Sequence, residues 1–170
     1  GGTVKIETVR FGWIEVSEDQ VVRFPRGLLA FESVQEYVLL PHGEGSPFSF
    51  LQAVYEPELA FVVTNPLWLR PGYRVDVYRE DLDELDLKED DPVSVLTIVT
   101  VPRDGGDITV NLLAPLVINQ RSRLGKQIVQ NESAYRTRHS LREELARARG
   151  AAAKPAARAE GLAPMLRTVG

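Results

Sequence analysis

Short stretches of alternating apolar and polar residues run along most of the chain, and this spacing predicts strands rather than helices. Residues 4–7 and 13–16 show the alternation, whereas residues 93–101 are almost all Val, Ile, Leu and Thr, which is typical of a strand buried on both faces. The same criteria predict further strands over residues 21–24, 48–55, 60–64 and 126–130. Many short strands with little helix between them predict a mostly all-β fold, an antiparallel and barrel-like domain with a few short helices.

One longer ladder, over residues 108–119, contains a proline. Its apolar positions share one strand face: Ile108, Val110, Leu112, Ala114, Leu116 and Ile118. Pro115 has no backbone N–H to give to a neighbouring strand, so we expect this strand at a sheet edge or interrupted by a bulge. Residues 121–125 then predict a hairpin loop that leads into the strand at residues 126–130.

Helical signals inside the body of the chain are few. Ser33 and Glu36 have the spacing of a capping box and predict one helical turn. Residues 81–87 place Leu82 and Leu85 on one face among several acids, which predicts a short acidic helix. Neither segment is long enough to change the assignment to a mostly β fold.

The clearest helical pattern lies near the end of the sequence. A capping box begins at Ser140, apolar residues follow at helical spacing, and Gly150 predicts the end of the helix. Residues 151–170 are rich in Ala, Arg and Pro with little to bury, so we expect a flexible tail. The chain therefore divides into a barrel-like domain at residues 1–140 and a C-terminal helix and tail at residues 141–170.

Charge is distributed unevenly along the chain. The net charge is −4, but residues 141–170 carry +3, so residues 1–140 carry −7. Residues 76–91 alone hold nine acids and two bases, which equals the whole excess of the body. Residues 1–140 are acidic enough to repel a polyphosphate backbone, which disfavours nucleic acid as a direct partner.

Three interpretations of the acidic run at residues 76–91 stay open. It is a solvated surface that keeps the protein soluble, or a patch that steers a basic partner or repels RNA. Alternatively, its charge is neutralised within the protein by a basic set: Arg121, Arg123, Lys126, Arg136 and Arg138.

Residues suited to catalysis or metal binding are scarce. The sequence has no cysteine, and its two histidines are His42, in a loop, and His139, whose protonation the neighbouring Arg136 and Arg138 oppose. No Gly-x-Ser-x-Gly elbow offers a serine nucleophile. We expect no enzymatic activity, no cofactor and no metal. Because no apolar run approaches the roughly 18 residues of a membrane helix, we also expect no membrane contact and a cytoplasmic location.

Several segments stand out when they are taken together and in order. They are Phe24-Pro-Arg-Gly27 with Phe31-Glu32, then Leu51-Gln52, Ala60-Phe-Val-Val-Thr-Asn-Pro66, Val95-Leu-Thr-Ile-Val-Thr-Val-Pro102, Asn111-Leu-Leu-Ala-Pro-Leu-Val-Ile-Asn119, Gly125-Lys-Gln127 and Tyr135-x-x-Arg-His139. Their order and spacing resemble the FliW family of flagellar assembly factors over about residues 4–141. Arg26 and Asn65 depart from the residues usual in that family.

The resemblance implies a protein-binding switch without chemistry. Members of the family bind CsrA, a small dimeric RNA-binding repressor of flagellin translation, and relieve its repression. They also bind flagellin, which competes for them. The resemblance therefore implies CsrA and flagellin as partners, and we expect a monomer when neither is present.

The alternative function is an RNA-binding barrel module that acts directly on mRNA. Such a module needs aromatic side chains in a basic groove, on which successive bases stack. Trp13, Trp68 and Tyr73 lie in segments with no basic run. The sequence therefore favours the protein-binding switch.

Two groups of residues are candidates for partner binding. We expect six acids near the CsrA-binding face, where their charge would attract a basic RNA-binding surface and repel RNA. These acids are Asp81, Asp83, Glu84, Glu89, Asp90 and Asp91. The competing hypothesis is that binding uses apolar strand edges and turn residues, for which the candidates are Phe24, Pro25, Gly27, Phe31 and Asn65.

Overall fold

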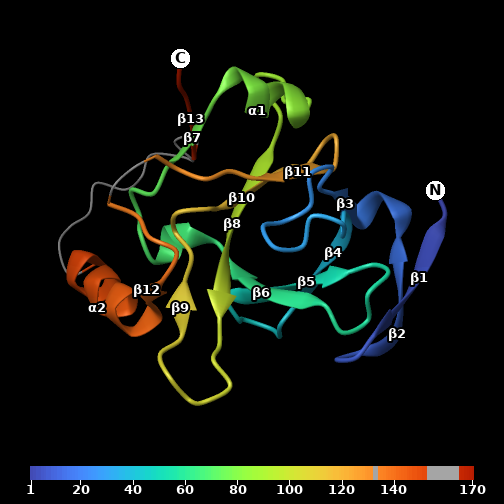
Figure 1. Cartoon of the computed structure of the whole chain (residues 1–170), viewed down its shortest axis with the longest axis horizontal. Coiled ribbons are helices and arrows are strands. Elements are labelled where there is room, and N and C mark those ends of the chain that lie inside the picture. The colour runs from blue at the N-terminus through green and yellow to red at the C-terminus, as the bar shows by residue number, and fades with distance from the viewer. Residues whose placement is uncertain (132–133, 153–164) are drawn as a thin grey trace.

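A computed structural model of the chain describes residues 1–131, 134–152 and 165–170, and a closed barrel forms its centre (Figure 1). Seven strands of these described residues make the barrel: β3 (Val21–Arg23), β4 (Glu36–Pro41), β5 (Phe48–Ala53), β6 (Ala60–Thr64), β8 (Val93–Thr100), β10 (Leu116–Asn119) and β11 (Leu124–Gln127). The ring closes because β10 pairs with both β8 and β11. β11 and β3 are parallel, and the other neighbours are antiparallel. The predicted barrel-like, mostly antiparallel fold is confirmed.

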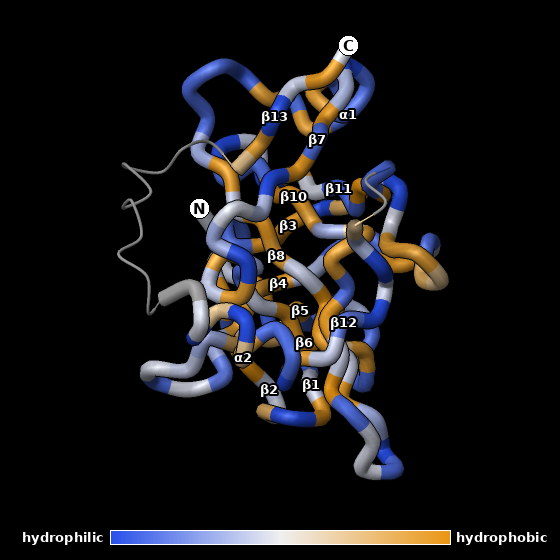
Figure 2. Tube along the Cα trace, turned by 90° about the vertical axis from the view of Figure 1, so that its left-hand side faces the viewer, coloured by the Kyte–Doolittle hydropathy of each residue, from blue (hydrophilic) through white to orange (hydrophobic). Residues whose placement is uncertain are grey.

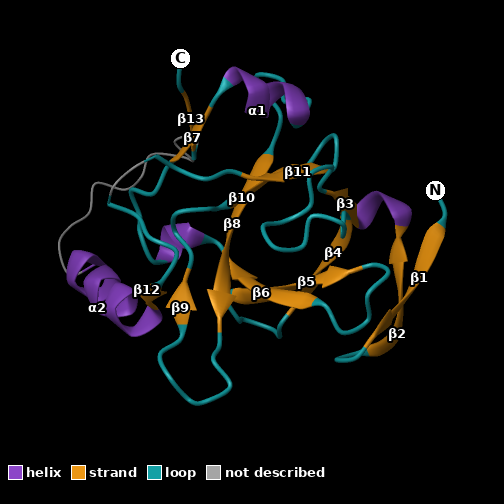
Figure 3. Ribbon diagram, in the orientation of Figure 1, coloured by secondary structure: helices purple, strands orange, loops and turns teal. Residues whose placement is uncertain are grey.

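Smaller elements surround the barrel (Figure 3). β1 (Thr3–Thr8) and β2 (Gly12–Ser17) form a separate hairpin, while β9 (Thr109–Val110) and β12 (His139–Ser140) continue the sheet beyond β8. β7 (Val75–Val77) pairs in parallel with β13 (Leu166–Thr168). The helices are η1 (Glu18–Gln20), η2 (Pro66–Trp68), α1 (Arg79–Glu84) and α2 (Leu141–Ala152).

The core lies on both sides of the barrel wall. One cluster takes residues from all around the ring, such as Tyr37, Leu51 and Leu116, and so fills the barrel. A second cluster packs outside the wall, between the barrel, β7 and the two α-helices. Strand β8 contributes Leu96 to the first cluster and Val95 to the second, which confirms the prediction of a strand buried on both faces.

Two local predictions from the sequence are wrong. Ser33 does not start a helical turn; instead, Glu36 opens strand β4, which the sequence did not predict. The ladder at residues 108–119 is interrupted around Pro115, as expected, but not by a bulge, because the chain leaves the sheet after Val110 and returns at Leu116. In the gap, the Asn111 side chain accepts hydrogen bonds from two backbone N–H groups at 3.1 and 3.0 Å, in place of a strand neighbour. The returning strand β10 lies between β8 and β11 and is therefore not an edge strand.

The C-terminal extension is partly ordered against the body. Helix α2 begins where the sequence predicts, but it continues through Gly150 to Ala152. Residues 153–164 of the predicted flexible tail lie outside the described residues. The prediction is wrong for residues 166–168, which form β13 beside β7 (Figure 2). Residues 166–168 become ordered because β7 lies outside the barrel sheet and offers an edge to which β13 can add.

Candidate partner-binding surface

The turn that follows β3 is built by two of the residues expected to bind a partner. Phe24 is fully buried, and its ring lies edge-on to Tyr37 with 5.7 Å between the ring centroids. Gly27 is buried with a φ of +65°, and its N–H donates to the Phe24 carbonyl at 2.7 Å. These two residues therefore shape the turn from within. Pro25 and Phe31 remain exposed, so another protein can contact them directly.

Helix α1 is fastened to the barrel wall by part of its own acidic charge. The Lys126 ammonium on β11 lies 2.6 Å from Asp81 Oδ1 and also contacts the Glu84 carboxylate. Burial works against the charge of Lys126, but hydrogen bonds to these two acids outweigh it and hold its pKa above the ordinary value. Asp81 is itself buried. The carboxylates of Asp81 and Glu84 therefore form ion pairs within the protein.

Arg26 joins the turn to the helix. Its guanidinium lies 3.3 Å from Glu80 Oε1 and also contacts Glu84. A small pocket of about 180 Å³ opens at this junction, lined by Pro25, Arg26, Glu84, Gly125 and Lys126. The structure thus brings together members of the two groups that the sequence had offered as competing hypotheses, Pro25 from the turn and Glu84 from the acidic set.

The loop after α1 is held by residues of the β10–β11 hairpin. Asn119 is fully buried, and its amide donates to the Leu85 carbonyl at 3.0 Å and to Asp91 Oδ2 at 3.1 Å. Arg121 lies 2.7 Å from Asp91 Oδ1 and 3.1 Å from Asp86 Oδ2. The hydrogen bond from Arg121 lowers the pKa of Asp91 to about 2 and also lowers that of Asp86. Internal pairing is therefore confirmed for Arg121 and Lys126, while Arg123 donates to the Gln20 carbonyl instead.

Three candidate acids remain directed at solvent. Asp83, Glu89 and Asp90 are exposed, and no ion pair found among the described residues includes them. Residues 76–91 hold nine acids and two bases and so carry −7. Four cations from elsewhere in the chain form ion pairs with these acids and reduce the net charge of the region to −3; they are Arg26, Arg121, Lys126 and Arg167. A charged surface persists, but it is smaller than the sequence indicates.

Asn65 takes a different position from the other candidates. Its side chain accepts a hydrogen bond from the Leu67 N–H at 2.9 Å and so caps the N-terminus of η2. None of the contacts described for Asn65 links it to the turn or to α1. The residue is exposed and available to a partner, but the structure does not join it to the surface around Arg26.

The aromatic side chains do not form the platform that RNA binding needs. The Trp68 indole donates to Thr64 Oγ1 at 2.6 Å and packs edge-on against Phe48. Tyr73 is buried, and its hydroxyl donates to the Leu112 carbonyl at 2.6 Å. Of the three aromatics considered, Trp13 alone is mostly exposed, at 69%. A single exposed ring does not stack successive bases.

One buried ionic cluster was missed from the sequence. Glu144 on α2 is 2% exposed, and its carboxylate pairs with Arg70, whose Nε lies 2.5 Å from Oε1 and whose Nη2 lies 3.1 Å from Oε2. Next to it lies His139, which is also buried and accepts a hydrogen bond from the Arg136 N–H at 2.8 Å. Glu144 lies between Leu141 and Leu145 on the apolar stripe of the helix, which was the available signal.

The cluster holds α2 against the body and opposes protonation of His139. Burial lowers the pKa of His139, and the nearby cations Arg136, Arg70 and Arg147 lower it further against the opposing effect of Glu144. The expectation that Arg136 opposes protonation of His139 is confirmed. Within residues 1–131, 134–152 and 165–170, no group of three or more His, Asp or Glu side chains is arranged to hold a metal ion. No helix in those ranges is both long and apolar enough to span a membrane.

Comparisons with known proteins identify the family. A family profile described as FliW protein matches residues 5–141, which is most of the chain. The chain belongs to the FliW family. A flagellar assembly factor FliW from Desulfitobacterium hafniense (strain DSM 10664 / DCB-2) is 43% identical over 138 residues, which are 81% of this chain and 91% of that protein. A FliW from Natranaerobius thermophilus is 43% identical over 150 residues, 87% of this chain and 99% of that protein.

A solved structure agrees with this assignment. The crystal structure of a flagellar assembly factor FliW superposes with a TM-score of 0.73 at 38% sequence identity, covering 80% of this chain and 95% of that one. The barrel described here is therefore the FliW fold. Helix α2 begins at Leu141, where the match to the family profile ends, and strand β13 lies wholly beyond it.

Proposed function

We propose that this chain is a non-catalytic regulator of flagellum assembly that antagonises CsrA and is sequestered by flagellin. The observation that supports the proposal is the match to the FliW family over residues 5–141, whose members are named flagellar assembly factors. The function needs two mutually exclusive protein interfaces and no reaction. Flagellin that accumulates would occupy the regulator, release CsrA and so stop further flagellin synthesis.

The direct test uses three purified proteins. The immobilised chain should retain CsrA, should separately retain flagellin, and should release CsrA when flagellin is added in excess. Unrelated RNA should not be retained, and a salt-dependent shift of RNA by the isolated chain would instead favour the RNA-binding module. If the chain retains neither protein, the proposal fails.

We propose that CsrA binds to the side of the barrel that carries α1 and the turn after β3. Because Asp81, Glu84 and Asp91 already bind cations within the chain, the charge available to a partner comes mainly from Asp83, Glu89 and Asp90. Opposite charge speeds the encounter with a basic RNA-binding surface, and salt weakens this effect. Once the two proteins are bound, the same charge repels the phosphates of RNA.

Neutralising the exposed acids should slow binding to CsrA. We expect the triple variant Asp83→Asn, Glu89→Gln, Asp90→Asn to associate about fivefold more slowly at low salt, with the difference fading above about 0.3 M salt. Stopped-flow association at two salt concentrations measures it. The control removes three exposed acids elsewhere, Glu7→Gln, Glu15→Gln and Glu44→Gln, at an equal change in net charge. Equal rates for the two triple variants would leave the acidic segment as a solvated surface.

A further inference from the structure

Strand β7 lies apart from the barrel, and both of its edges are filled by unusual partners. On one edge, the Gln130 side chain acts as a substitute strand: its Oε1 accepts from the Asp76 N–H at 2.8 Å and its Nε2 donates to the Asp76 carbonyl at 3.2 Å. The other edge takes the C-terminal strand β13. Within the described residues, β7 has no other strand neighbour. The edge of β7 that pairs with β13 therefore accepts an extended segment.

The contacts of β13 with this edge have a defined register. Val75 N–H donates to the Met165 carbonyl at 2.7 Å, and Val169 N–H donates to the Val77 carbonyl at 2.9 Å. Between these two bonds, Arg167 is paired with Asp76, and its Nε lies 2.7 Å from Asp76 Oδ1. Backbone hydrogen bonds thus hold the strand, and one ion pair joins the basic residue at its centre to β7.

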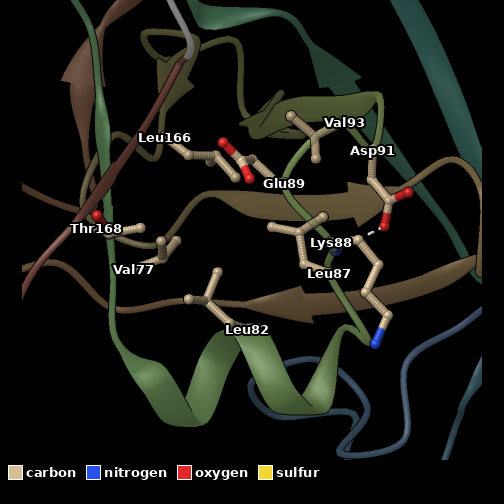
Figure 4. Close-up of a pocket in the computed structure, with 9 residues that line it drawn as sticks. All are labelled: Val77, Leu82, Leu87, Lys88, Glu89, Asp91, Val93, Leu166 and Thr168. Atoms are coloured by element: carbon tan, nitrogen blue, oxygen red, sulfur yellow. Dashed lines mark hydrogen bonds between the residues drawn. The ribbon is translucent and has the colours of Figure 1, made fainter.

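A groove beside the strand receives an apolar side chain. It has a volume of about 390 Å³, and Leu166 and Thr168 enter it from β13 (Figure 4). The body lines it with the apolar residues Val77, Leu82, Leu87 and Val93 and with the charged residues Lys88, Glu89 and Asp91. Leu166 is only partly buried, and Arg167 and Thr168 are exposed. The occupant therefore covers the groove shallowly and leaves part of it open.

Three observations indicate that the occupant is exchangeable. β7 and the groove lie within the stretch matched by the family profile, whereas β13 lies beyond residue 141. The paired strand is three residues long, which is too short to be stable by itself. The charges are complementary, since residues 141–170 carry +3 and residues 1–140 carry −7. The body supplies a site, and an appended segment fills it.

We propose that the edge of β7 and the adjoining groove form a strand-addition site for an extended peptide with an apolar residue followed by a basic one. Residues 165–170 are its occupant within the same chain. A protein partner that presents such a peptide displaces them by pairing with β7 in the same register. The groove adjoins the surface proposed above for CsrA, because Glu89 lines it. The proposal does not depend on that function, since the peptide tests below use neither CsrA nor flagellin.

The test asks whether a free copy of the segment binds when the tethered copy is weakened. The probe is a fluorescent peptide of residues 164–170, and the full-length protein carries Leu166→Asp, which places a negative charge in a groove that Glu89 and Asp91 also line. We expect the apparent affinity for the peptide to be at least tenfold higher than that of the wild-type chain, because a tethered strand competes at millimolar effective concentration. The control Ala146→Asp changes the charge equally on the exposed side of α2 and should match wild type.

Modified peptides test the register. Methylating the Val169 nitrogen removes the donor to Val77 and should abolish binding, whereas methylating the Thr168 nitrogen should have little effect, because alternate N–H groups of a parallel strand point away from its neighbour. A second full-length variant, Arg167→Glu, breaks the ion pair with Asp76 and should also expose the site. If Leu166→Asp disturbs the fold, this variant provides the same comparison.

Three results would overturn the proposal. The first is that neither opened variant binds the peptide. The second is that both methylated peptides bind alike, which would mean that the groove holds an apolar side chain without strand pairing. The third is a dimer of the full-length chain, seen by light scattering, that dissociates when Leu166→Asp is introduced, because the strand would then come from a second copy.

Discussion

Gly27→Ala should lower the free energy of unfolding by about 3 kcal/mol. A Cβ at this position would lie 2.5 Å from the Cα and carbonyl oxygen of Glu32, and these backbone atoms cannot rotate aside as a flexible side chain can. The φ of +65° adds strain for any residue with a Cβ. The turn would have to open, which would also disturb the buried Phe24 ring. Urea unfolding of the two proteins measures the difference.

Gly45 provides a matched control for Gly27. It has a φ of +74°, but nothing lies within 4 Å of a Cβ built there. Gly45→Ala therefore tests the backbone strain without the clash, and it should cost about 1 kcal/mol. If the two variants lose equal stability, the close approach to Glu32 has no effect.

The strands of the barrel could be predicted because they carry their own signal. Residues 60–64 were predicted as a strand and form β6 with the same bounds, since each of them contributes an apolar or β-branched side chain to the wall. The composition of residues 93–101 predicted a strand buried on both faces, and β8 is buried in this way. Where local composition and tertiary pairing agree, the sequence alone is sufficient to predict the strand.

The failures arise where distant pairing overrides local preference. The capping-box spacing of Ser33 and Glu36 favours a helical turn, but the Glu36 carbonyl accepts from the Val54 N–H at 2.9 Å, across the β4–β5 pair. The strand at residues 166–168 has no apolar alternation of its own, and its contact between Arg167 and Asp76 joins residues 91 positions apart. No window of local sequence contains that information.

The candidate surface was predicted in part. The acidic run was evident from charge alone, but which acids remain free depends on where Arg26, Arg121 and Lys126 lie in the fold. Lys126 reaches Asp81 because β11 passes beside α1. A count of charges along the sequence does not contain this arrangement of the two elements. For the same reason, the separation of Asn65 from the turn after β3 could not be foreseen.

Replacing Glu144 by alanine should cost helix α2 about 3 kcal/mol of protection against opening. The carboxylate is 2% exposed, and its loss would leave Arg70, whose side chain is 19% exposed, charged and poorly hydrated beneath the helix. The helix can avoid this cost only by leaving the barrel, which exposes its amides to solvent. Hydrogen exchange of the α2 amides therefore reports the effect. An equal loss in the exposed neighbour variant Glu143→Ala would show that removing a negative charge from the first turn of the helix, and not breaking the ion pair, is responsible.

The pH dependence of Glu144→Gln separates the charge of the pair from its packing. Burial raises the pKa of Glu144, but the hydrogen bond and charge of Arg70 and the charge of Arg147 outweigh it, so the pKa lies below the ordinary value of 4.5. A carboxyl with a lowered pKa in the folded state stabilises that state above pH 4.5 and loses this contribution as the pH falls through the folded-state pKa. Glutamine keeps the shape without the charge. Wild type should therefore protect the α2 amides better than Glu144→Gln at about pH 6, and the gap should narrow steadily below pH 4.5. A gap that stays constant down to about pH 3 would mean that the charge of Glu144 does not hold the helix on the barrel.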